Sequence, residues 1–219
     1  MATKKNKITK DQIVSEYMNY MLENSEKPKS VFQFTKMIAC TEAEFYQFFG
    51  NFESIEKEVY TQFLDKTLEL INKDPNFEDY DMKSKMLSFY FTLFELLSAN
   101  RSYVLMSLHA HKNKLKNLMQ FSEMRTGYKA FIAAILTDDY RIKNEKVQEI
   151  QEKAITEGSW IQLLMTLKFW MDDSSANFEK TDIYIEKSVK ATFELMNISP
   201  IESILDFGKF LFKEKIQTR

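Results

Sequence analysis

The stretch SVFQFTKMIACTEAEFYQFFGNFESI, residues 30–55, contains two short helical segments on either side of an almost uncharged turn. Ser30 is a favourable N-cap for a helix over 31–38, because its hydroxyl can accept a hydrogen bond from the first helical turn. Thr41, with a glutamate three residues later, has the spacing of a capping box and predicts a second helix over 42–48. Two short helices joined by a tight turn follow the plan of a helix-turn-helix, whose second helix enters the DNA major groove.

The rest of the chain is also predicted to be helical. Only four glycines and three prolines interrupt it, and they fall between segments whose apolar residues repeat at helical spacing. The first such segment starts at Thr9 and carries Ile13, Tyr17 and Met21 on one face. Gly158 is expected to end a polar helix. Further helices are expected over 53–73, 79–99, 102–110, 113–137, 143–157, 159–173, 180–197 and 201–215. The fold class is therefore all-α, with about ten helices.

Composition indicates an ordinary globular protein, with 44% hydrophobic and 28% charged residues. The formal net charge is −2, so any binding of nucleic acid must come from a local basic patch. The single cysteine, Cys40, excludes an intrachain disulfide and fits a reducing compartment. The polar, basic start does not match a signal peptide, and no apolar run reaches the ~18 residues that span a bilayer. We expect a cytoplasmic protein.

The order of residues in the predicted helix-turn-helix resembles a known family. Residues 8–60 are similar to the DNA-binding domain of the TetR family of bacterial repressors. The matching residues follow without a gap, as Phe34-Thr35, Lys36-Met37-Ile38-Ala39-Cys40-Thr41 and Phe45-Tyr46-Gln47-Phe48-Phe49. Ala39 stands where that family has its turn glycine, and Phe52 stands where it commonly has a lysine. The resemblance implies a DNA-binding head over 1–52 and an all-helical ligand-binding and dimerisation body over 53–219.

The resemblance also implies a regulator that binds double-stranded operator DNA as a homodimer and responds to a ligand. The DNA contacts expected from it are Lys29, Ser30, Thr35, Lys36, Thr41, Glu42, Glu44 and Tyr46. Two interpretations of Glu42 and Glu44 stay open. Either carboxylate can accept a hydrogen bond from cytosine N4, or both simply favour the positive end of the helix dipole.

The charge of the head is unusual for a DNA reader. Between residues 30 and 60 two lysines stand against five glutamates, whereas neutralisation of phosphates supplies most non-specific DNA affinity. The other cations nearby are Lys4, Lys5, Lys7 and Lys10 of the N-terminal arm and the loop pair Lys27 and Lys29. We therefore expect weak, salt-sensitive DNA binding that depends on the arm.

The body is expected to enclose a small apolar ligand and to hold two chains together. The candidate ligand residues are Phe89, Phe94, Met106, His109, Tyr128, Phe131 and Met165, although such side chains more often serve only as core. Two apolar stripes on the helices over 159–172 and 180–197 predict a four-helix dimer interface. Their residues are Trp160, Leu164, Leu167, Val189, Phe193 and Met196. The competing interpretation is that both stripes face the chain's own core.

Enzyme chemistry is not expected, and neither is a cofactor or a metal. The two histidines, His109 and His111, lie about 200° apart on a helix at ~100° per residue, so they do not form a metal-binding pair. The scattered glycines do not form a phosphate-binding loop. The alternative to a regulator is a TetR-like protein that binds lipid or isoprenoid and has lost DNA binding. In that case the amphipathic segment 201–215 would dock on a membrane.

Overall fold

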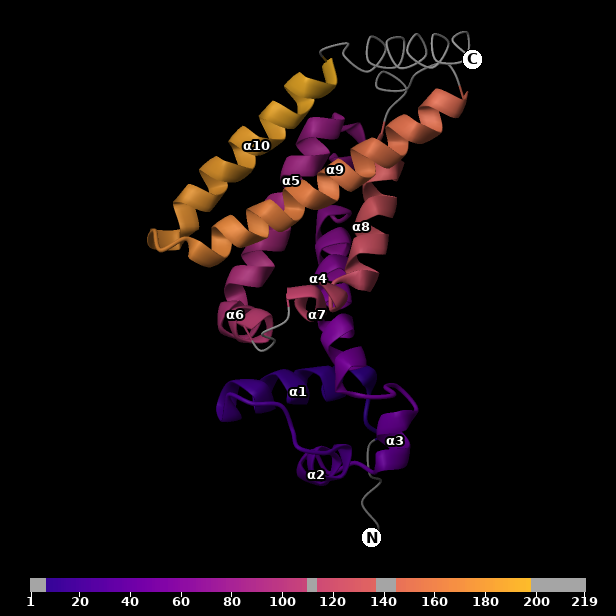
Figure 1. Cartoon of the computed structure of the whole chain (residues 1–219), viewed down its shortest axis with the longest axis vertical. Helices are drawn as coiled ribbons and strands as arrows, with labels where there is room; N and C mark the ends of the chain where they lie inside the picture. The colour runs from indigo at the N-terminus through magenta and orange to yellow at the C-terminus, as the bar shows by residue number, and fades with distance from the viewer. Residues whose placement is uncertain (1–6, 110–113, 137–144, 198–219) are drawn as a thin grey trace, which may run out of the picture.

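The computed structural model describes residues 7–109, 114–136 and 145–197, and every regular element in these ranges is a helix (Figure 1). The α-helices are α1 (Lys10–Asn24), α2 (Val31–Met37), α3 (Glu42–Tyr46), α4 (Phe52–Ile71), α5 (Met82–Ala99), α6 (Arg101–His109), α7 (Lys114–Met119), α8 (Ser122–Ile135), α9 (Glu145–Asp172) and α10 (Glu179–Asn197). Short 3₁₀ turns, Phe77–Asp79 and Ala176–Phe178, precede α5 and α10. The predicted all-α fold is confirmed. None of the helices within the described ranges is both long and apolar enough to cross a membrane. The helix expected over 201–215 lies outside them.

The head is built around one aromatic side chain, Phe34 of α2. Its ring meets those of Tyr17, Phe45 and Phe52 nearly edge-on, at centroid distances of 6.1, 6.2 and 5.7 Å. These partners belong to α1, α3 and α4, so a single buried ring joins every helix of the head. Aromatic pairs in this geometry stabilise a core beyond the area that they bury.

The turn between α2 and α3 has the hydrogen bond of a Schellman motif. Ile38 is the C-cap of α2, and the backbone N–H of Cys40 donates to the carbonyl of Thr35 at 3.0 Å. Ala39, between them, has a φ of 54°. This is the left-handed region that favours glycine, so alanine carries a steric cost here. The turn keeps its shape in spite of the substitution.

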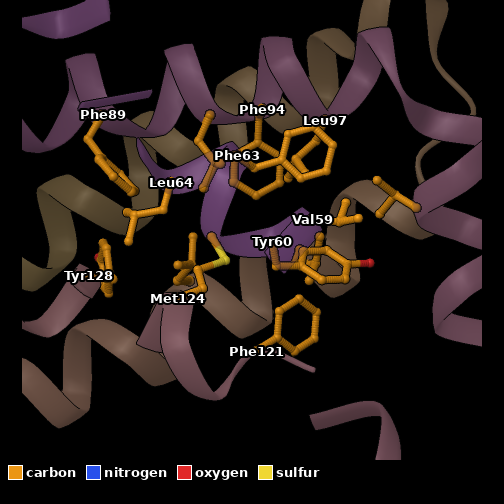
Figure 2. Packing of buried hydrophobic residues seen from close by; sticks show 14 of the residues in the cluster. Val59, Tyr60, Phe63, Leu64, Phe89, Phe94, Leu97, Phe121, Met124 and Tyr128 are labelled. Carbon is orange, nitrogen blue, oxygen red and sulfur yellow. The ribbon is translucent and has the colours of Figure 1, made fainter. Parts of the chain in front are cut away.

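Helix α4 begins in the head and ends in the body (Figure 1). Phe52 belongs to the aromatic core of the head, whereas Tyr60 and Leu64 pack among side chains of the body (Figure 2). Gly127 allows α8 to approach α4 closely, because a Cβ atom there would lie 2.5 Å from Cδ2 of Leu64. One continuous helix therefore belongs to both the head and the body.

The single helix predicted over 113–137 is instead divided into α7 and α8. The chain turns at Gln120 and Phe121, and both side chains are buried. The ring of Phe121 lies 4.4 Å from that of Tyr60, centroid to centroid (Figure 2). Burial of this aromatic ring is the physical reason for the break.

Helices α9 and α10 form an antiparallel pair along one side of the body (Figure 1). Gly158 does not end a helix as predicted, because α9 runs through it without interruption. Glycine costs only about 1 kcal/mol inside a helix, and burial of the neighbouring Trp160 outweighs that cost. The turn into α10 is held by Asp173, whose carboxylate accepts from the backbone N–H groups of Ser175 at 2.8 Å and Thr181 at 3.0 Å.

Arg101 caps the carboxyl end of α9 from another part of the chain. Its guanidinium donates to the carbonyl oxygens of Trp170 at 2.9 Å and Met171 at 3.0 Å. The same guanidinium stacks 4.4 Å from the centre of the Trp170 ring. It hydrogen-bonds carbonyl groups at the end of the helix, and it ties the start of α6 to the α9–α10 pair.

Candidate nucleic-acid interface and ligand site

Most residues expected to contact DNA lie on the outside of the head. Side chains that are exposed there belong to Lys29, Ser30, Lys36, Thr41, Glu42 and Tyr46. Thr35 differs, because it is only 2% exposed and its hydroxyl donates to the carbonyl of Phe32 at 3.1 Å. A side chain used in this way cannot reach a phosphate or a base, so Thr35 is corrected to an internal position of α2.

The structure distinguishes between the two interpretations of Glu42 and Glu44. Oε2 of Glu44 accepts hydrogen bonds from the backbone N–H and from the hydroxyl of Thr41, both at 2.8 Å. The backbone N–H of Glu44 in turn donates to the hydroxyl of Thr41 at 3.2 Å, which completes the predicted capping box. Glu44 therefore stabilises the start of α3, and only Glu42 presents an exposed carboxylate on that helix.

Two glutamates near the start of α4, Glu56 and Glu58, are paired with lysines. Glu56 is buried, its Oε1 lies 2.7 Å from Nζ of Lys27, and the hydroxyl of Tyr17 donates to it at 2.9 Å. Glu58 pairs with Lys10 at 2.6 Å. The excess of glutamates in the sequence therefore does not appear as an excess of negative charge on the outer face of α2 and α3.

The head also exposes large apolar side chains. The structure leaves Phe32, Met37, Tyr46 and Phe48 open to solvent, on α2, on α3 and in the turn that follows α3. Single exposed apolar residues are common on proteins, whereas several on one small head are less usual.

Buried hydroxyl groups lie where the head meets the body. Burial, together with the neighbouring Glu56 carboxylate, raises the pKa of Tyr17 far above its ordinary value. Tyr17 therefore stays protonated and can donate to Glu56 at any physiological pH. On the body side, Oη of Tyr60 lies 2.7 Å from Oγ of Ser107, and burial is the main reason that the pKa of Tyr60 is raised. These contacts connect α4 to α1 on one side and to α6 on the other.

The interior of the body is closed around the expected ligand residues. Phe89, Phe94 and Tyr128 are buried, and the ring of Phe131 stacks on that of Phe89 at 4.9 Å. The space lined by aromatic and leucine side chains of α4, α5, α8 and α9 is about 10 Å³, roughly the volume needed to place one water molecule. A ligand in this place must displace side chains.

The three other expected ligand residues are less buried. Met106 is half-buried, His109 is exposed with its Nδ1 2.6 Å from the carbonyl oxygen of Leu105, and Met165 is 57% exposed on α9. Met165 is therefore corrected from a cavity residue to a surface residue. His111 lies outside the described residues. Within the described ranges no group of three or more metal-ligating side chains lies close enough to hold a metal ion.

The apolar stripes expected at a dimer interface face the chain's own interior. Trp160, Leu167, Val189 and Phe193 are buried within the single chain, and Leu164 is half-buried. The side chain of Met196 lies outside the described residues. The competing interpretation therefore fits these side chains. The opposite face of the α9–α10 pair is apolar too, with Ile161, Met165, Phe169, Ile183 and Leu195 exposed.

One site was missed by the sequence-based reasoning altogether. A hollow of about 390 Å³ lies between the start of α4 and the end of α7, and Gln120 is one of the residues that line it. No periodicity or motif marks this glutamine. The nearest signal in the sequence is its place beside an aromatic residue in a segment predicted to be helical, which says nothing about a hollow.

Comparison with known proteins gives one match. A family model described as "Tetracyclin repressor-like, C-terminal domain" matches residues 85–211, which is more than half of the chain. Searches of curated proteins and of solved structures gave no match. The matched segment begins in α5 and covers the closed interior and the α9–α10 pair, whereas the head lies outside it.

Proposed function

The chain belongs to the family of tetracycline-repressor-like regulators, and from this membership we propose that it binds double-stranded DNA as a homodimer and responds to a small apolar ligand. The observation that carries the proposal is the helix-turn-helix of the head. Both short helices have side-chain caps, and the turn between them has the Schellman hydrogen bond. This geometry presents the start of α3 as the helix that would enter the major groove.

The arrangement of charges supports weak rather than absent DNA binding. Lys29 and Lys36 are exposed, and neither forms an ion pair within the described residues. On α3, Glu42 is the exposed acid, whereas Glu44 is half-buried and accepts hydrogen bonds at the start of the helix. Lys7 is exposed just before α1, and the rest of the basic arm, with Lys4 and Lys5, lies outside the described residues.

The proposal predicts how binding depends on salt. A dimer that places both exposed lysines of each head on phosphates releases about four counterions. These contacts make the negative slope of log K against log salt steeper by at most about 4. Binding of a labelled duplex from upstream of the protein's own gene would be measured by fluorescence anisotropy at several salt concentrations. The double variant Lys29→Ala/Lys36→Ala should bind more weakly and with a flatter slope.

A matched control removes two lysines far from the head. Lys66 lies on the part of α4 that is in the body, Lys73 lies just after the end of that helix, and both pair with Glu69 at the surface. The variant Lys66→Ala/Lys73→Ala should bind like the wild type. Equal affinity and equal salt slope for all three proteins would contradict the proposed contacts.

The proposed dimer uses the outer face of α9 and α10. Ile161, Met165 and Phe169 are exposed at steps of four residues, which puts them on one side of α9. Phe169 stacks on Tyr184 of α10 at 4.5 Å, so the apolar face continues from one helix to the other. The same face from a second chain would bury it in a four-helix arrangement.

Light scattering distinguishes the dimer from a monomer. The wild type should have about twice the 26.0 kDa chain mass at micromolar concentration. Met165→Glu should lower the mass to one chain without unfolding, since this side chain is exposed. Leu70→Glu, at an exposed position of α4, is the matched control and should leave the mass unchanged. A monomeric wild type would refute the paired-head mechanism.

A second function is favoured by one observation, the exposed apolar residues of the head. Phe32, Met37 and Phe48 suit an apolar partner better than a phosphate backbone. A TetR-like protein that binds lipid and no longer binds DNA would account for them. Native mass spectrometry of the purified protein tests this alternative: copurified lipid, with no DNA affinity at low salt, would replace the regulator by the lipid-binding protein.

A further inference from the structure

A hollow of about 290 Å³ lies between the second half of α5 and the turn that leads from α9 into α10. Helices α5 and α10 pack against one another in this part of the body (Figure 1). The volume is near the lower end of the range of small-molecule sites. This α5–α10 hollow is far larger than the closed interior of the body, and different residues line it.

Two carboxylates from different helices line the α5–α10 hollow. Glu95 is exposed on α5, and Asp182 is exposed on α10. Neither forms an ion pair within the described ranges. Among the described residues that line the hollow there is no lysine or arginine. The lining therefore carries two negative charges and no positive charge.

A third carboxylate strengthens this negative charge. Glu186 follows Asp182 by four residues on α10, so both lie on the same side of the helix, where like charges repel one another. Burial raises the pKa of Asp182 above its ordinary value, and the negative charges of Glu186 and Asp173 raise it further. A positive charge in the hollow would relieve this repulsion.

Aromatic side chains form much of the remaining lining, namely Phe91, Phe94, Trp170 and Phe178. Phe94 and Trp170 are buried, so an occupant can touch only the half-buried rings of Phe91 and Phe178. The guanidinium of Arg101 already stacks 4.5 Å from the centre of the Phe178 ring. No cation packs on Phe91 within the part of the chain that the structure describes. The Phe91 ring is therefore the one that remains for a cation.

The hydroxyl groups that line the hollow already have partners. Oγ of Ser98 accepts a hydrogen bond from the indole N–H of Trp170 at 2.9 Å. The hydroxyl of Thr181 donates to the carboxylate of Asp173 at 2.7 Å. An occupant is therefore recognised mainly by negative charge and by an aromatic face, which is the combination that quaternary ammonium groups require.

We propose that the α5–α10 hollow binds a small organic cation with a quaternary ammonium group, held between the carboxylates of Glu95 and Asp182 and the ring of Phe91. Such a group has no N–H to donate, so it needs nearby charge rather than directed hydrogen bonds. The inference depends neither on DNA binding by the head nor on a ligand in the closed interior of the body.

The proposed site connects two helices of the body. Because Glu95 belongs to α5 and Asp182 to α10, one bound cation attracts both helices and should hold the start of α10 against α5. Hydrogen exchange in residues 177–186 should therefore become slower when the cation is added, since local opening of this segment would release it.

Isothermal titration calorimetry of the full chain at constant ionic strength tests the proposal with a matched pair of probes. Choline carries a quaternary ammonium group, and 3,3-dimethylbutan-1-ol has the same shape without the charge. Choline should bind about 10-fold more tightly, because only the cation interacts with the carboxylates and with the face of the ring.

Three variants locate the site. Glu95→Gln and Asp182→Asn should each weaken the binding of choline by about 3–10-fold, because each removes one negative charge at an exposed position. Phe91→Leu should weaken it by about 2–5-fold, because the aromatic face is lost while an apolar side chain remains. Glu123→Gln, at an exposed position of α8, is the matched control and should bind choline like the wild type.

Equal affinity of the wild type for choline and for the alcohol, or no binding of either, would overturn the site. An equal loss of affinity in Glu123→Gln would also overturn it, since the effect would then come from the overall charge of the protein. If circular dichroism shows that a variant does not fold, the comparison of the two probes on the wild type decides, together with hydrogen exchange in residues 177–186.

Discussion

Replacing Ala39 by glycine should stabilise the protein, although it removes a methyl group and makes the unfolded chain more flexible. Ala39 has a φ of 54°, and the hydrogen bond from Cys40 to Thr35 fixes it there. A residue with a Cβ atom loses about 1–2 kcal/mol in this region. Glycine also lowers the free energy of unfolding by ~0.4–1 kcal/mol, because it raises the entropy of the unfolded chain. The net gain is about 0.5–1 kcal/mol in the free energy of unfolding.

Urea unfolding followed by far-ultraviolet circular dichroism measures this gain as a higher midpoint at unchanged slope. Hydrogen exchange of residues 31–48 is the more direct assay, because it reports opening of the segment that contains the turn. Protection there should rise by a factor of about 2–5 if the turn alone is stabilised, since 1.4 kcal/mol corresponds to a factor of ten.

Ala43→Gly is the matched control, since Ala43 lies on the exposed side of α3. At this ordinary helical position glycine should cost ~0.5–1 kcal/mol. The same alanine-to-glycine substitution should therefore raise the free energy of unfolding at position 39 and lower it at position 43. If Ala39→Gly destabilises the head as much as Ala43→Gly does, the left-handed turn and its Schellman bond are refuted.

Three further predictions concern the glycines Gly158 and Gly127 and the carboxylate of Asp173. Gly158→Ala should raise the free energy of unfolding by ~0.5–1 kcal/mol, measured in urea, because nothing lies within 4 Å of the added Cβ. Gly127→Ala should lower it by about 1 kcal/mol in the same assay, since its Cβ would overlap with Leu64; a gain would mean that α4 and α8 separate easily. Burial raises the pKa of the Asp173 carboxyl, but hydrogen bonds from Ser175 and Thr181 outweigh it and hold the pKa at about 2, below its ordinary 3.8. The stabilisation is therefore present above pH 3.8 and lost as pH falls through about 2, so Asp173→Asn should destabilise the protein at pH 7 and have little effect near pH 2.

The helix-turn-helix could be predicted because its determinants are local. The caps at Ser30 and Thr41 act within three residues of themselves, and both are present in the structure. The resemblance to the TetR family places Ala39 at the turn glycine, and its φ of 54° agrees with that position. Signals of this kind need no knowledge of the rest of the chain.

The faces of α9 and α10 could not be assigned in the same way. Helix α9 has apolar residues on both sides, with Leu163 and Leu167 inside and Ile161 and Met165 outside. Periodicity identifies each stripe, but it does not tell which one faces the chain's own core. That choice depends on α5, which packs on α10 from a distant part of the sequence.

The ion pairs of the head could not be predicted from the sequence for a related reason. Lys27 and Glu56 are far apart along the chain, and a count of charges treats both as exposed. Only the folded structure reveals that the pair is internal. The unpaired amide of Gln120 is likewise a property of the space around it, and no pattern in the sequence carries that information.

The contacts of Arg101 give α6 an unusual mechanical position. This helix has nine residues. Arg101, its first residue, is fastened to the end of α9, and Ser107, near its last turn, is fastened to Tyr60 of α4. A short helix that is held by hydrogen bonds at both ends transmits a displacement along its axis without bending. In the dimer that we propose, a shift between protomers packed on α9 would act through α6 on the middle of α4 and would change the distance between the two heads.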